Sequence, residues 1–195
     1  MYKKLIMAFA AFLILVSGCY DDKSYNDNRI VNNYADSIYE HSQRVTKLDK
    51  IEFEVIHLDL YPFNYYKNRK YNVWIYADSI DKYSSNDKLY QLTSSHKSLA
   101  VRYVAFKLLL KRDSHRAISY LIRDINNEDS ICAKHLDEGW MQLLTSIRVN
   151  LAQNRKLYNV SVEDSVSLDK AVLGSKQKDN IWYYTMYLKK KLSKK

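Results

Sequence analysis

The chain has 195 residues, a net charge of +9, three glycines and one proline. This length is enough for one domain with a hydrophobic core, and the scarcity of helix-breaking residues favours helices. So few glycines exclude a Gly-rich phosphate loop. Lysines near the C-terminus concentrate the positive charge in a tail, and no nucleic-acid-binding motif is present, so we expect no nucleic acid as a partner.

The first 18 residues predict an export signal. A charged start, Tyr-Lys-Lys at residues 2–4, precedes an apolar run over residues 5–15 that is too short to span a bilayer comfortably. Val-Ser-Gly-Cys at residues 16–19 resembles the lipobox of bacterial lipoproteins. The resemblance implies cleavage after residue 18, a membrane anchor through lipidated Cys19, and an outer-membrane location that faces either the periplasm or the cell surface.

A polar tether over residues 19–27 and a single helical HEAT-like domain over residues 28–195 are expected to follow the signal in residues 1–18. The chain has two cysteines, and lipid on Cys19 would leave Cys132 with no cysteine to pair with, so packing must stabilise the domain. His135 and Asp137 lie near Cys132, but so few ligands on one short segment do not indicate a metal site. We expect Cys132 to be a buried structural residue.

Apolar residues at helical spacing predict an amphipathic helix over residues 27–48. The period then changes to alternation on both sides of Pro62, which indicates a small β-hairpin near residues 51–76. Residues 64–70 between the alternating runs are polar and aromatic, and they form the candidate binding loop. The alternative is that these tyrosines cover the margin of the core. The candidate contact residues of the loop are Tyr65, Tyr66 and Arg69.

Two helices are predicted at the centre of the chain. The first, over residues 97–111, is apolar on two opposite faces, so it must lie between other elements. The second, over residues 114–126, has one apolar stripe and forms an antiparallel pair with the first. Arg102 lies on an otherwise apolar side of the first helix, so we expect its charge to find a carboxylate, Asp124 or Asp129.

Residues 94–109, which read Ser-Ser-His-Lys-Ser-Leu-Ala-Val-Arg-Tyr-Val-Ala-Phe-Lys-Leu-Leu, resemble a helix of a HEAT-type repeat. In that family the second helix ends near an acidic turn, as it does here at residues 126–129. The resemblance implies a mainly α fold of antiparallel helix pairs around a central buried helix, as in exported bacterial lipoproteins of unknown function. One clear copy is present, whereas HEAT folds need about three stacked repeats.

Three further helices are predicted after this pair. Apolar spacing places one over residues 140–151. Ser161 and Asp164 resemble a capping box that opens a helix ending at Gly174. The last predicted helix covers residues 180–192 and ends in lysines, as the helix dipole prefers.

The sequence does not indicate an enzyme. The five histidines lack the spacing of a metal site such as His-Glu-x-x-His. Asp-Ser-His at residues 113–115 holds the residue types of a catalytic triad, but neighbours in sequence point apart, so we interpret Ser114 as a helix cap. We therefore expect a non-enzyme that binds no metal or cofactor.

Asp-Ser followed by an aliphatic residue occurs at residues 36–38, 78–80, 129–131 and 164–166. This tripeptide resembles the acceptor of a general O-glycosylation system for exported proteins in some Gram-negative bacteria. The resemblance implies modification at Ser79 and Ser130, which we expect to lie in turns. The structural alternative is that Asp-Ser marks the start of a helix.

The sequence thus favours a lipid-anchored module of the outer membrane that binds another envelope protein through helices or loops. The alternative is a lipoprotein that binds glycan or envelope polymer, because aromatic faces stack on sugars and the tyrosine-rich candidate loop offers several of them.

Overall fold

The computed structural model describes residues 28–45, 52–57, 74–135 and 138–181. A first helix covers residues 28–42. The elements after it are β1 (Gln43–Val45), β2 (Glu52–His57), α2 (Trp74–Tyr83), α3 (Asn86–Ser95), α4 (Leu99–Arg112), α5 (Ser114–Arg123), β3 (Ser130–His135), β4 (Glu138–Leu143), α6 (Leu144–Ala152), α7 (Arg155–Tyr158) and α8 (Val162–Gly174). The prediction of a mainly helical fold with a small β element is confirmed.

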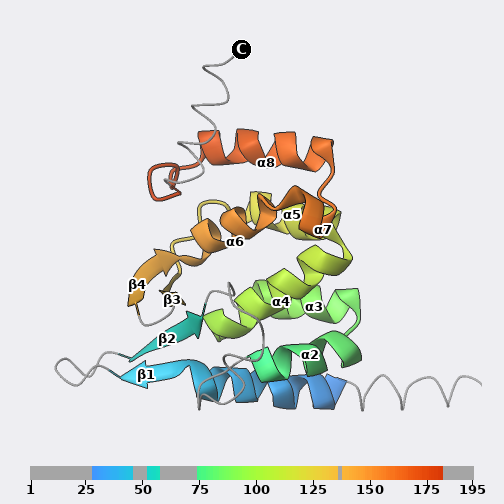
Figure 1. Ribbon diagram of the computed structural model, residues 1–195, viewed down its shortest axis with the longest axis vertical. Coiled ribbons are helices and arrows are strands. Elements are labelled where there is room, and N and C mark those ends of the chain that lie inside the picture. Colours follow the sequence, from blue (N-terminus) through green and yellow to red (C-terminus); the bar gives the residue numbers. More distant parts are fainter. Residues whose placement is uncertain (1–27, 46–51, 58–73, 136–137, 182–195) are drawn as a thin grey trace, which may run out of the picture.

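The helices form successive layers along the long axis of the molecule (Figure 1). The first helix and α2 form the base, α3 and α4 the next layer, α5 and α6 with the short α7 the third, and α8 the top. Helix α4 contacts α2 on one side and α5, α6 and α7 on the other, while α8 packs on α5. The stack therefore consists of helix pairs that share one continuous core.

The strands form one mixed sheet along one edge of this stack (Figure 1). Strands β1 and β2 form an antiparallel hairpin, which lies in the sequence between the two helices of the base layer. Strands β3 and β4 form a second antiparallel hairpin, which lies in the sequence between α5 and α6. The two hairpins join through parallel pairing of β2 with β3, in which Val55 is opposite Cys132. The sheet thus ties the base layer to the third layer across the end of α4.

Helix α4 lies at the centre of the stack, as the two apolar faces predicted. Its buried residues include side chains from both faces, namely Ala100, Val101, Tyr103, Val104, Ala105, Phe106, Leu108, Leu109 and Leu110. Ser98 caps the helix by accepting a hydrogen bond from the backbone N–H of Val101 at 3.2 Å. Removing these apolar side chains from water on both faces makes α4 the largest contributor to the core.

Glu54 of β2 binds the N-terminus of α4. Its Oε1 accepts a hydrogen bond from the N–H of Leu99 at 3.0 Å, and its Oε2 accepts from the N–H of Ala100 at 2.8 Å. Oε2 also accepts from the hydroxyls of Ser98 at 2.6 Å and Ser42 at 3.3 Å. A carboxylate is favoured here because the first N–H groups of a helix lack intrahelical partners and carry partial positive charge.

Two local predictions placed elements incorrectly. The first helix ends at residue 42 rather than 48, because the chain continues as β1, in which Gln43 pairs with Glu54. The predicted hairpin is correct for β2, but its partner is β1, and Ile75, expected in a second strand, belongs to α2. The whole segment between β2 and α2, residues 58–73, lies outside the described residues.

The segment before α6 was also predicted incorrectly. Trp140 and Leu143, expected in a helix, belong to β4, where Trp140 is opposite Ala133 of β3. The apolar residues in a segment as short as β4 fit the pattern of a strand as well as that of a helical turn. Pairing with β3 decides in favour of the strand. Strand β3 had no prediction of its own.

Of the two predicted helix caps, one is confirmed and the other is shifted by one residue. Ser161 opens α8 and accepts from the N–H of Asp164 at 3.0 Å, so the capping interaction is confirmed. At α5 the cap is Asp113, which accepts from the N–H of Arg116 at 3.1 Å, whereas Ser114 is the first helical residue. The predicted helix over residues 180–192 lies almost entirely outside the described residues.

We expect Glu54→Gln to destabilise the fold by about 1–3 kcal/mol, because an amide cannot accept on both of its atoms and has no charge to offer the helix N-terminus. Urea denaturation of both proteins measures the difference. The matched control is Glu40→Gln on the exposed side of the first helix, which we expect to change stability by less than about 0.5 kcal/mol. Equal losses in the two variants would contradict the proposed role of Glu54.

Candidate binding surface

Of the predicted site residues, only Ser79 and Ser130 lie within the described residues. Cys19 and the candidate loop residues Tyr65, Tyr66 and Arg69 lie outside the described residues. Ser79 lies within α2 and is half-buried, so its expected position in a turn is wrong. The same expectation is wrong for Ser130, which is exposed as the first residue of β3, where its hydroxyl donates to the carbonyl of Glu128 at 3.3 Å.

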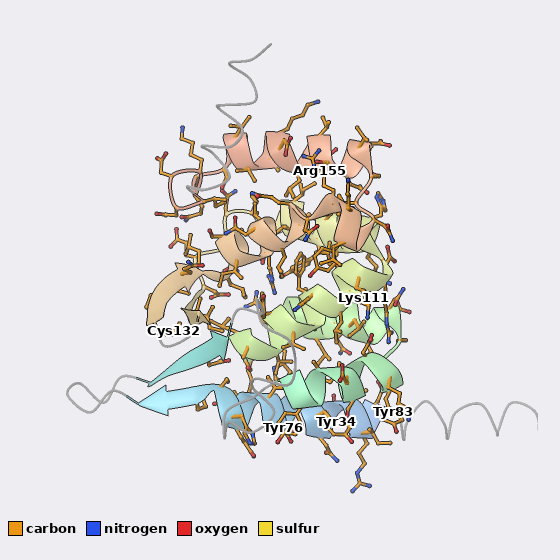
Figure 2. All side chains as sticks on the ribbon, in the orientation of Figure 1. Tyr34, Tyr76, Tyr83, Lys111, Cys132 and Arg155 are labelled. Carbon is orange, nitrogen blue, oxygen red and sulfur yellow. The ribbon has the colours of Figure 1, made fainter. Side chains whose placement is uncertain are left out.

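Cys132 lies in β3 (Figure 2). It is half-buried, whereas we expected it to be fully buried. Within the described ranges, no group of three or more His, Cys, Asp or Glu side chains is arranged to hold a metal ion. The side chains of the triad-like segment, residues 113–115, have three separate partners. Asp113 caps α5, Ser114 donates to the carbonyl of Asn159 at 3.1 Å, and His115 reaches α8.

Arg148 of α6 is the largest fully buried side chain among the described residues, with 0% of its surface exposed. Its guanidinium carbon lies 5.2 Å from the ring centre of Phe106 and 5.3 Å from that of Tyr120. The guanidinium donates to Asp124 Oδ2 at 3.0 Å. It also donates to the backbone carbonyls of Thr93 at 3.2 Å and Arg102 at 3.1 Å. Burial lowers the pKa of Arg148, but an arginine keeps its charge in proteins.

Arg102 of α4 lies beside this buried group and confirms the expected ion pairs. Its Nη1 is 2.6 Å from Asp129 Oδ2, and its Nη2 is 3.8 Å from Asp124 Oδ2. Its Nε donates to the carbonyl of Thr93 at 3.3 Å. Asp124 is therefore shared by Arg102 and Arg148, and Thr93 accepts from both. This network joins α3, α4, α5 and α6, so it has a role in the fold.

The same network extends to the surface through two tyrosines. Tyr120 of α5 donates its hydroxyl to Asp124 Oδ2 at 2.9 Å. Its ring meets the ring of Tyr90 of α3 edge-on, with 5.9 Å between the ring centres. Tyr90 is half-buried, so one part of its ring is held by the core while another part reaches solvent.

Two arginines of α5 lie against Tyr90. The guanidinium carbon of Arg116 is 4.6 Å from the ring centre, and that of Arg123 is 5.9 Å away. Arg123 also donates a hydrogen bond to the hydroxyl of Tyr90. Arg116 forms an ion pair with the exposed Asp87 of α3 at 2.6 Å. These four residues, Asp87, Tyr90, Arg116 and Arg123, define what we term the α3–α5 surface.

The α3–α5 surface can bind a polar or anionic group. Arg123 is exposed, and among the described residues it has no carboxylate partner. Because the tyrosine ring and hydroxyl orient its guanidinium, less conformational entropy is lost when further N–H donors bind a ligand. Sequence reasoning missed this surface because Tyr90 and Arg123 lie on different helices. The available signal was that Arg116 and Arg123 fall outside the apolar stripe of α5 at a spacing of two turns.

A second aromatic cluster lies at the base of the stack. Figure 2 shows Tyr34 of the first helix near Tyr76 of α2, and their ring centres are 6.4 Å apart. The ring of His41 is 5.2 Å from that of Tyr76. Its Nδ1 is 2.8 Å from the carbonyl of Ser37, so this nitrogen carries the proton and Nε2 can accept from the Tyr76 hydroxyl at 3.4 Å.

Searches among models of known protein families, curated proteins and solved structures found no match to this chain. None of the described helices is both long and apolar enough to cross a bilayer.

We expect Arg148→Met to destabilise the protein by about 3–5 kcal/mol, because Asp124 and two buried carbonyls lose a charged donor that methionine cannot replace. The control, Arg29→Met, removes the same charge from an exposed position of the first helix. Denaturant midpoints of the three proteins test the difference. A loss below about 1 kcal/mol for Arg148→Met would show that the network contributes little to stability.

We expect the contribution of His115 to stability to depend on pH. Its Nδ1 is 2.8 Å from Asp164 Oδ1 of α8, and hydrogen bonding to this carboxylate raises the pKa of His115. The protonated form therefore favours the folded state, so the contribution is complete below about pH 6.5 and is lost as the pH rises through the higher folded pKa. The melting temperature of the unaltered protein should exceed that of His115→Ala at low pH, and the two should converge as the pH rises through the folded pKa. A constant difference from pH 5 to pH 9 would contradict this account.

Proposed function

We propose that this protein is a helical interaction module, anchored through lipid on Cys19, that binds another envelope protein at the α3–α5 surface. The observation that carries the proposal is the contact of Tyr90 on α3 with two arginines of the adjoining α5, Arg116 and Arg123. Tyrosine and arginine are enriched among the residues that contribute most to protein interfaces. A fixed aromatic ring with oriented guanidinium groups supplies both apolar contact and charge-assisted hydrogen bonds.

The support behind the surface favours this interpretation. Tyr90 packs on Tyr120, which donates to Asp124 in the buried arginine network. The surface residues are thus already held in a fixed geometry before a partner binds, which lowers the entropic cost of binding. Anchoring by Cys19 would hold the module at the membrane, where partners of the same envelope are concentrated.

We expect Arg123→Glu to weaken partner binding by at least about 30-fold, because it replaces an oriented donor with a like charge opposite an anionic group. Chemical cross-linking in native cells, followed by mass spectrometry of the attached protein, measures the loss. Tyr90→Phe should have a smaller effect, since it removes the hydroxyl that orients Arg123 but keeps the ring.

The matched control is Lys170→Glu, the same charge reversal at an exposed position of α8. Denaturation of each variant must show an unchanged fold. Retention of the same partner by Arg123→Glu at undiminished yield would exclude the α3–α5 surface. The absence of any recurrent protein partner for the unaltered chain would exclude the function itself.

The alternative function is glycan binding at the base of the stack. The observation in its favour is the half-buried ring of Tyr76, which adjoins Tyr34 and follows the tyrosine-rich candidate loop in sequence. Aromatic rings provide flat faces on which sugars stack. A carbohydrate array probed with the protein, with Tyr34→Ala as the variant, would distinguish this function from protein binding, which Arg123→Glu affects instead.

A further inference from the structure

Helix α8 ends the described stack and buries one face against α5. The residues on that face are Asp164, Ser165, Leu168 and Val172. Each lower layer contains at least two helices, whereas α8 lies alone at the top in the described part of the chain (Figure 1). The flank on which a second helix would pack is thus available.

This flank is apolar. Val162, Val166 and Leu173 are 79%, 45% and 39% exposed, and their spacing in α8 places them along one side of the helix. Leu157 of the neighbouring α7 is 63% exposed. These four account for all but one of the exposed large hydrophobic residues among those described, the other being Met141. We term Val162, Val166 and Leu173 the α8 flank. Leu157 is not part of it, because helical spacing places it on the opposite side of α7 from Arg155, which reaches α8.

The α8 flank faces the side of α7, where a second helix of the layer would lie. Asp169 of α8, which shares this side of the helix, is 3.7 Å from the guanidinium of Arg155 in α7. Arg155 lies just below α8 at the same end of the molecule (Figure 2). Because the face toward α5 is already buried and the opposite face is polar, an occupant of the flank would lie beside α8 and above α7.

The chain beyond α8 starts at the correct position to be this occupant. Ser175 ends α8 and donates its hydroxyl to the carbonyl of Ile125 at 3.2 Å, and the N–H of Lys176 donates to Asn126 Oδ1 at 2.9 Å. These bonds fix the turn after α8 on the end of α5. Ile181 is 1% exposed, so the chain is still held by the core where residues 182–195 begin.

The length and the charge of residues 182–195 both fit docking along α8. A helix of residues 182–195 would extend about 21 Å, against about 20 Å for the 13 residues of α8. Tyr184, Leu188 and Leu192 continue from Ile181 at helical spacing. If the segment runs back along α8, its terminal lysines reach the N-terminus of α8, where Glu163 is exposed. Opposite charges would then meet at that end.

We propose that residues 182–195 dock on the α8 flank as a helix antiparallel to α8 and complete a final helix pair. Burial of Val162, Val166 and Leu173 against the tyrosines and leucines of the segment supplies the driving force. The docked segment would also place the C-terminal lysines at a fixed edge of the module. This inference does not depend on the proposed function of the α3–α5 surface.

Hydrogen exchange of the complete chain, read by mass spectrometry, tests the proposal. We expect amides of residues 184–192 to exchange at least about tenfold more slowly than unstructured peptide. Val166→Asp should abolish this protection, because a carboxylate cannot be buried against the segment. Ser167→Asp, on the polar face of α8, should preserve it. Val162→Asp is the second variant, since an acidic residue in the first turn does not disfavour α8 itself.

Three results would overturn the proposal. The first is exchange of residues 184–192 at unprotected rates in the unaltered chain. The second is protection that survives both Val162→Asp and Val166→Asp while α8 remains folded. The third is protection that disappears on dilution, which would show that a second copy of the chain covers the flank.

Discussion

The fold depends on two carboxylates that hold the first turn of α4 from different parts of the chain. Glu54 of β2 accepts from the backbone N–H groups of Leu99 and Ala100. Asp129, just before β3, binds Arg102 one turn further along. Because β2 and β3 pair in parallel, both acidic residues are fixed by the same sheet. The most buried helix is thus positioned by charges at one end and by apolar packing along its length.

The positioned helix explains why an arginine can be fully buried. Arg148 donates to the carbonyl of Arg102, which is available where α4 passes beneath α6. The guanidinium also shares Asp124 with Arg102, so two positive charges meet two acidic residues in one network. Both terminal nitrogens of the guanidinium find partners on other helices or turns, whereas its buried Nε has none among the described residues. Strong pairing of this kind is what makes a buried charge tolerable. The network therefore requires the layers to adopt one arrangement, which also fixes Tyr120 and, through it, Tyr90.

The sequence predicted what depends on local pattern and missed what depends on distant pairing. The helical period of α4 and the acidic partners of Arg102 were found because a helix repeats every 3.6 residues and a buried charge needs a counterion. The first hairpin was assigned to the wrong partner strand, and Trp140 to a helix, because a strand is defined by the segment it pairs with. Glu54 as a cap, and Tyr90 with Arg123, were missed for the same reason. Arg148 gave no signal, since it lies in an ordinary apolar run.

The position of the proposed anchor bears on how a partner would meet the module. Residues 19–27 separate Cys19 from the first helix, and a chain of this length extends at most about 30 Å. The first helix forms the base of the stack, whereas α3 and α5 belong to the layers above it (Figure 1). A base held near the membrane would leave the α3–α5 surface on the side of the stack, facing along the bilayer. Partners fixed in the same membrane could then reach Arg123 without passing beneath the module, which fits docking on an envelope protein better than contact with lipid head groups.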